Sequence, residues 1–138
     1  MNTIFKNSTA VVVGWLVGSV TNMGLIQLGF KIMPVPGLDP NDMRTLVDIL
    51  PTLNAPYFIF PFLGHAVGTY IGACITGLLA SSHQMKLSLA VGGLFFLGGV
   101  AANYMLPGPL WFTATDLVIA YLPMAFLGGK TARKFKRI

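Results

Sequence analysis

Residues 9–33 decide the fold class, and they read TAVVVGWLVGSVTNMGLIQLGFKIM. The single charged side chain of this stretch, Lys31, lies close to its end, where the long aliphatic stem can reach the membrane interface. An apolar helix of about 20 residues, at about 1.5 Å per residue, is long enough to cross the hydrocarbon core of a bilayer. The stretch therefore predicts a transmembrane helix.

Three more apolar stretches follow, at residues 57–80, 87–106 and 110–128. Hydrophobic residues make up 54% of the 138-residue chain and charged residues only 9%, whereas a soluble domain usually has about 25% charged residues. We therefore predict an all-α membrane protein, a bundle of four transmembrane helices that forms one integral membrane domain over residues 1–138. Cys74 is the only cysteine, which excludes an internal disulfide.

Basic residues gather on one predicted side of the membrane. Lys6 precedes the first span, Lys86 lies in the link between the second and third spans, and the tail 129–138 is rich in Lys and Arg. Because Lys and Arg near span ends stay on the cytoplasmic side, we predict that both termini are cytoplasmic, in a bacterial inner (plasma) membrane. The lipid bilayer is the expected partner, and the net charge of +5 then reflects topology and anionic lipid rather than nucleic acid.

The loop 34–56 should lie outside and carry a short amphipathic helix. Asp39 is the predicted N-cap, followed by Pro40 at the first helical position. Apolar residues then recur at helical spacing until Pro51, which ends the pattern. Calcium binding by the carboxylates of this loop is an alternative, but they lack the spacing of a known calcium loop.

Small residues recur at four-residue intervals along the predicted spans. Such stripes let helix backbones approach closely, and close packing replaces the hydrophobic drive that lipid cannot supply. The spacing alone leaves open whether these faces join helices of one chain, of a homo-oligomer or of a larger membrane complex. The predicted packing glycines are Gly14, Gly18, Gly64, Gly68, Gly72, Gly98 and Gly99.

Asp116 is the strongest candidate for chemistry, because an ionisable side chain inside a membrane is costly and needs a proton, a cation or hydrogen-bond donors. It lies about 9 Å along the fourth span from Leu110. Gln27 and Asn103 should reach a similar depth, so the three side chains could form one polar cluster that opens to the outside. A purely structural role, in which Asp116 only holds helices together, is the alternative.

His65 is the second candidate, at about 12 Å along the second span. Asn22 should lie at a similar depth, and a neutral imidazole bonded to Asn22 is the structural interpretation, with a proton relay as the functional one. His83 falls in the cytoplasmic link, so the two histidines cannot share a metal ion. The sequence predicts no cofactor, no metal site and no catalytic nucleophile.

Three hypotheses of function remain. The preferred one is a structural or accessory membrane protein that packs through its glycine faces. The alternative is a small proton- or cation-coupled transporter or channel that uses Asp116 and His65. The third is a membrane-embedded enzyme that acts on lipid or quinone.

Overall fold

The computed structural model describes residues 2–138 and contains helices and no strand over that range. Four segments are long and apolar enough to cross a membrane, which confirms the predicted all-helical bundle. The first is α1 (Thr3–Ile32), and the second is the segment Ala55–Leu79, which contains α3 (Ile59–Leu79). The third is α4 (Gln84–Met105), and the fourth, Leu110–Phe135, consists of α5 (Leu110–Ile119) and α6 (Leu122–Phe135).

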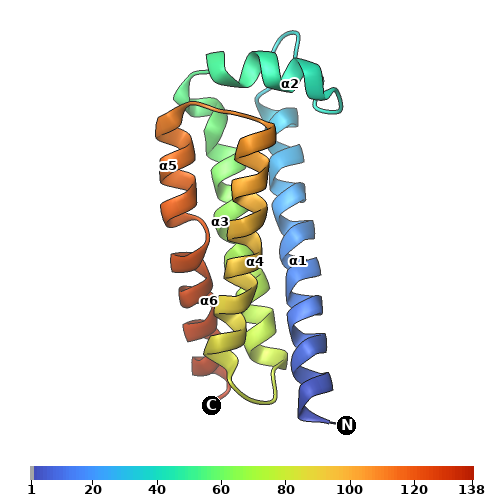
Figure 1. Cartoon of the computed structure of the whole chain (residues 1–138), viewed down its shortest axis with the longest axis vertical. Helices are drawn as coiled ribbons and strands as arrows, with labels where there is room; N and C mark the ends of the chain where they lie inside the picture. The colour runs from blue at the N-terminus through green and yellow to red at the C-terminus, as the bar shows by residue number, and fades with distance from the viewer. Residues whose placement is uncertain (1) are drawn as a thin grey trace.

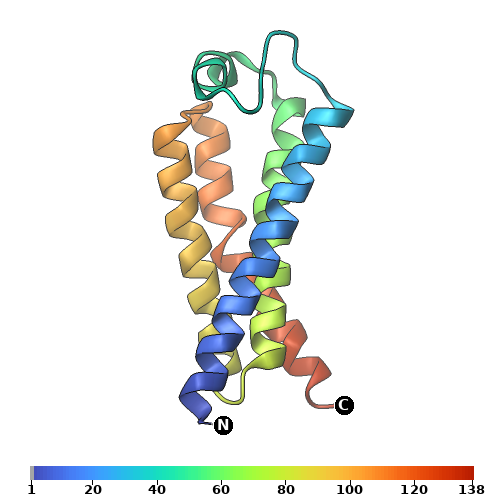
Figure 2. The same ribbon diagram turned by 90° about the vertical axis from the view of Figure 1, so that its right-hand side faces the viewer.

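The two ends of the chain lie at the same end of the bundle, and the connection between α1 and α3 covers the other end (Figure 1). That connection contains α2 (Met43–Ile49) and two short 3-10 turns, η1 (Leu50–Thr52) and η2 (Ala55–Phe58). The central helix is α3, which packs against α1, α4 and α6. In Figure 2, α1 and α4 separate toward the end that carries α2.

Glycine faces join α1 to α3 within this single chain. A Cβ placed on Gly68 would lie 2.7 Å from the carbonyl oxygen of Gly18, and one on Gly72 would lie 2.7 Å from that of Gly14. A Cβ placed on Gly64 would lie 2.8 Å from the side-chain oxygen of Asn22. These backbones touch only because the side chains are absent, so this glycine face is already occupied inside the chain.

Two of the predicted packing glycines in α4 differ from one another. A Cβ on Gly99 would collide with the ring of Tyr121, whereas nothing lies within 4 Å of the corresponding position on Gly98. Gly98 therefore makes no close helix contact within the described part of the chain, because adjacent residues of a helix point about 100° apart. The prediction left open whether Gly98 packs within one chain or between chains. Gly128 of α6, which the spacing did not single out, packs directly against the backbone of Tyr70 and Cys74.

The fourth membrane-length segment is broken between α5 and α6. The last bond of α5 runs from the Ala120 amide to the carbonyl of Asp116 (2.9 Å), and the Ala125 amide bonds to the carbonyl of Tyr121 (2.8 Å). Pro123 explains the break, since proline has no amide hydrogen and its ring clashes with the carbonyl four residues earlier, that of Ile119. At the break, the Ile119 carbonyl lacks the helical hydrogen bond that residue 123 would donate if it were not proline.

The cap of the loop helix differs from the prediction. Asp42, and not Asp39, is the N-cap of α2, because its carboxylate accepts from the amide of Arg44 (3.0 Å). Asp39 instead closes a turn by accepting from the amide of Asn41 (2.9 Å). The hydroxyl of Thr45 bonds to the carbonyl of Asp39 (3.0 Å), which holds Asp39 beside the first turn of α2 rather than at its start.

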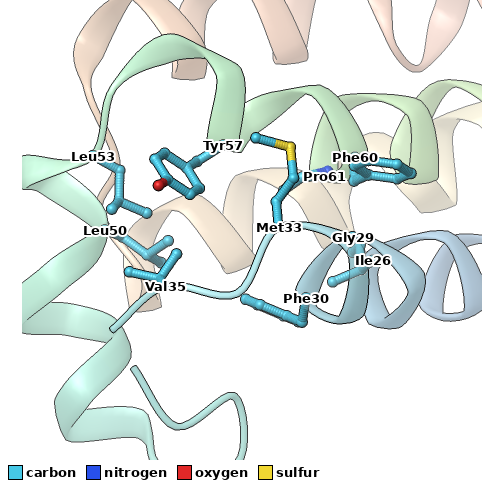
Figure 3. Close-up of a pocket in the computed structure, with 10 residues that line it drawn as sticks. All are labelled: Ile26, Gly29, Phe30, Met33, Val35, Leu50, Leu53, Tyr57, Phe60 and Pro61. Atoms are coloured by element: carbon cyan, nitrogen blue, oxygen red, sulfur yellow. The ribbon is translucent and has the colours of Figure 1, made fainter. Parts of the chain in front are cut away.

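A small apolar cavity lies under this loop, between the end of α1 and the start of α3 (Figure 3). Its volume is about 30 Å³, and its lining includes Phe30, Leu53 and Tyr57. The lining is almost entirely apolar, so the cavity offers few polar groups that could orient a substrate.

At the end with the termini, Asn7 of α1 holds the turn between α3 and α4. Its side-chain oxygen accepts from the amide and the hydroxyl of Ser81, both at 3.0 Å, and its side-chain nitrogen donates to the hydroxyl of Ser82 at 3.0 Å. Lys136, after α6, donates to the carbonyl of Ala80 at the end of α3. Both ends of the sequence thus contribute to closing one end of the bundle.

Candidate functional site

Asp116, His65 and Tyr121 form a hydrogen-bonded cluster in the interior of the bundle. Nδ1 of His65 lies 2.7 Å from Oδ1 of Asp116, and the hydroxyl of Tyr121 donates to Oδ2 of Asp116 at 2.9 Å. The rings of His65 and Tyr121 stack, with centroids 5.7 Å apart and planes 28° apart. We call these three side chains the His65–Asp116–Tyr121 cluster.

Burial differs among the three members. Asp116 has no exposed surface and Tyr121 is 2% exposed, whereas the side chain of His65 retains 16% of its exposure. Both carboxylate oxygens of Asp116 have a partner, which offsets the cost of removing this group from water. His65 is thus the member of the cluster that reaches the surface of the chain.

The register of two helices brings His65 and Asp116 together. Both α3 and α5 start at the end of the bundle that carries α2, so they run in the same direction (Figure 1). His65 comes six residues after Ile59, the start of α3, and Asp116 comes six residues after Leu110, the start of α5. Equal rise per residue therefore places the two side chains at the same level.

The helix break brings in Tyr121. On a continuous helix a residue five positions after Asp116 would point about 140° away from it. At the break the backbone of Tyr121 adopts φ −112° and ψ −82° instead, and the hydroxyl turns back to Asp116. Gly99 of α4 leaves the space that the Tyr121 ring occupies.

Asn103 belongs to a neighbouring pair and does not bond to Asp116. Its side-chain nitrogen donates to the carbonyl of Gly99 (2.9 Å), and its oxygen accepts from the hydroxyl of Thr113 (2.9 Å). The pair ties α4 to α5 one turn closer to α2 than the cluster. Asn103 therefore supports the cluster only indirectly, through Gly99 and the ring of Tyr121.

The structure does not bring Gln27 or Asn22 into this cluster, contrary to our expectation. Gln27 is exposed on α1, and its side-chain nitrogen lies 3.9 Å from the sulfur of Met23. Asn22 packs against Gly64 and Gly68, because α1 lies on the glycine face of α3. His65 is the next residue after Gly64 and so points about 100° away from that face.

Two buried oxygens near this level lack a hydrogen-bond partner among residues 2–138: Oδ1 of Asn22 and the hydroxyl oxygen of Thr69. Thr69 follows His65 by one turn of α3 and has no exposed surface. Within the same residues, no three His, Cys or acidic side chains gather in a way that could hold a metal ion. The cluster itself combines an imidazole, a carboxyl group and a phenol within hydrogen-bonding distance, which are groups that can exchange protons.

Comparison with known proteins adds no assignment to this geometry. The chain matches no family model, no curated protein and no solved structure. The cluster must therefore be interpreted from its own contacts.

Tyr121 is the member of the cluster that the sequence alone did not identify. Pro123 disfavours a regular helix near Val118 and Ile119, and the structure breaks the helix just after that position. The signal available in the sequence was the position of Tyr121. It is a polar aromatic residue close to Pro123 and five residues after Asp116. The direction of the Tyr121 side chain depends on the dihedral angles at the break, and residue spacing does not reveal these angles.

Proposed function

We propose that the chain is a small multi-pass protein of a bacterial inner membrane, with both termini in the cytoplasm. Four membrane-length helices support a multi-pass membrane protein. The orientation is supported by the basic residues at the end with the termini. Lys and Arg are retained on the cytoplasmic side of membrane proteins, whereas acidic residues have little effect.

Within that membrane we propose proton-coupled transport, with Asp116 as the proton-binding residue and His65 as its relay. The observation that carries this proposal is the gradient of exposure between the two: Asp116 is enclosed, while the side chain of His65 is 16% exposed. A proton that reaches Asp116 from the surface of the chain can pass through the imidazole. Nε2 would take up the proton and Nδ1 would release another to Oδ1, at 2.7 Å.

The helix break gives this proton site a way to act on the fold. Tyr121 belongs both to the cluster and to the break between α5 and α6. Protonation of Asp116 removes the negative charge that the Tyr121 hydroxyl stabilises, so the bond that holds the break in this geometry weakens. Broken helices beside ionisable residues are typical of transporters, where the unwound backbone lines the substrate path.

Replacing Asp116 with asparagine tests the proposal. Asparagine keeps the shape and both contacts if His65 accepts at Nδ1, so the fold should persist while proton binding is lost. In vesicles with an imposed pH gradient and clamped voltage, we expect D116N to abolish the proton flux carried by the wild type. Infrared spectra should show a carboxylic acid band that titrates with pH in the wild type and is absent from D116N.

The matched control is Asp48→Asn, which removes a carboxylate from the exposed surface of α2. It should leave both the flux and the buried-carboxyl band unchanged. Wild-type vesicles that pass no more protons than D116N vesicles, together with no titrating band at Asp116, would exclude the transport proposal.

A structural or accessory role is the second candidate, and one observation favours it. Gly98, Ala101 and Ala102 are exposed on α4, so a face of small residues stays free of contacts within the chain. Gly98→Leu should then lower the mass of an assembly isolated in mild detergent, with the fold of each chain unchanged. An identical mass for wild type and variant would count against this role.

The enzyme hypothesis has weaker support, because a lipid or quinone would have to approach Asp116 through the exposed edge of His65.

A further inference from the structure

Four basic side chains gather at the end of α6. Lys130 lies three residues before Arg133 and four before Lys134, on one face of α6, and Arg137 follows just after the helix, which ends at Phe135. All four are exposed, and they border an open groove on the surface at the end of α6. We call these four residues the basic face.

No acidic residue of residues 2–138 neutralises the basic face. Three of the four acidic residues, Asp39, Asp42 and Asp48, lie in the connection at the opposite end of the bundle. The fourth, Asp116, is buried and hydrogen-bonded to His65 in the interior of the bundle. The basic face therefore requires anions from outside the chain.

Lys136 does not belong to this face. Its ammonium group donates to the carbonyl of Ala80 and closes the end of α3. Lys136 therefore has a role inside the fold, whereas the four residues of the basic face have no acidic partner in the described part of the chain.

Two apolar residues border the same groove. Leu127 lies one turn before Lys130 and Ile138 lies after Arg137, and both are exposed; Thr131 also lines the groove. Because α6 is the last part of a membrane-length segment, the basic face begins where that segment reaches the water interface. A ligand bound here meets positive charge on one side and hydrocarbon on the other.

We infer that the basic face binds the phosphate-bearing headgroup of an anionic membrane lipid. Arginine pairs with phosphate oxygens in a bidentate manner and lysine supplies a point charge. Leu127 favours a lipid over soluble phosphate, because it is exposed on the membrane side of the basic face and offers a contact to acyl chains that free phosphate cannot make. Basic pockets beside transmembrane helices recognise lipid headgroups in this way.

The test is a lipid titration of the full chain in detergent, followed by native mass spectrometry. Dioleoylphosphatidylglycerol is the anionic probe and dioleoylphosphatidylcholine the zwitterionic one. We expect R133Q/K134Q to weaken phosphatidylglycerol binding about 30-fold, since each basic residue near a headgroup contributes about fivefold. Phosphatidylcholine binding should not change.

The matched control is K6Q/K86Q, which removes two charges at the same end of the bundle but outside the basic face. It should keep phosphatidylglycerol binding within about twofold of the wild type. Equal losses in the two double variants would show that only the overall charge matters and would overturn the inference. Displacement of the lipid by inorganic phosphate at matched ionic strength would overturn the choice of a lipid as ligand.

Discussion

Replacing Gly68 with leucine is expected to separate α1 from α3 and to lower the free energy of unfolding by about 3 kcal/mol, the upper end of the usual cost of overpacking. The upper end applies because the obstacle is backbone. A Cβ at this position would lie 2.7 Å from the carbonyl oxygen of Gly18 and 3.1 Å from the amide nitrogen of Asn22. Neither atom can rotate away as a side chain can, so the whole helix has to move.

Gly24→Leu is the matched control for this prediction. Gly24 also lies in a transmembrane helix, but nothing approaches within 4 Å of a Cβ placed there. Both variants lose one helix glycine and gain one leucine, so they differ in packing alone. Unfolding titrated with a denaturing detergent should separate them, and equal midpoints would contradict the observed α1–α3 contact.

Replacing Asp116 with leucine is expected to destabilise the bundle by about 1–3 kcal/mol, whereas Asp116→Asn should cost little. Leucine leaves the Tyr121 hydroxyl buried without an acceptor, at about 1–3 kcal/mol for such a group. The imidazole of His65 loses less, because its exposed edge can find another partner. The loss therefore exceeds the average of about 0.6 kcal/mol for a hydrogen bond in a membrane bundle.

A double variant distinguishes the unsatisfied hydroxyl from a loss of packing. In Asp116→Leu/Tyr121→Phe both the acceptor and the donor are gone, so part of the stability lost in Asp116→Leu should return. The same detergent titration measures all three variants. If Tyr121→Phe lowers stability equally with and without Asp116, the bond between the two residues contributes nothing.

The membrane-length helices could be predicted from the sequence because hydropathy and length act locally. Each span contains its own evidence, and the structure has four of them. The approximate position of the break after Asp116 could also be predicted, because Pro123 disturbs the helical turn that precedes it. The N-cap of α2 was harder to predict from the sequence. The choice between Asp39 and Asp42 depends on Thr45, which bonds back to Asp39.

The composition of the cluster could not be predicted, because it depends on how separate helices align. His65 and Asp116 are 51 residues apart, and a different starting point for the second span had placed His65 deeper than Asp116. Asn22 was expected beside His65 at the correct depth but on the wrong face of α3. Depth follows from counting residues along one helix, whereas the facing direction follows from the packing of α1 on the glycines of α3.

The close fit of α1 on α3 bears on how the chain is made. During synthesis α1 leaves the ribosome first, while its main partner follows only after the whole α2 connection has been translated. Until then Asn22 and the bare backbone at Gly14 and Gly18 face lipid or the insertion machinery. The contact between α1 and α3 can therefore form only after α3 has been inserted.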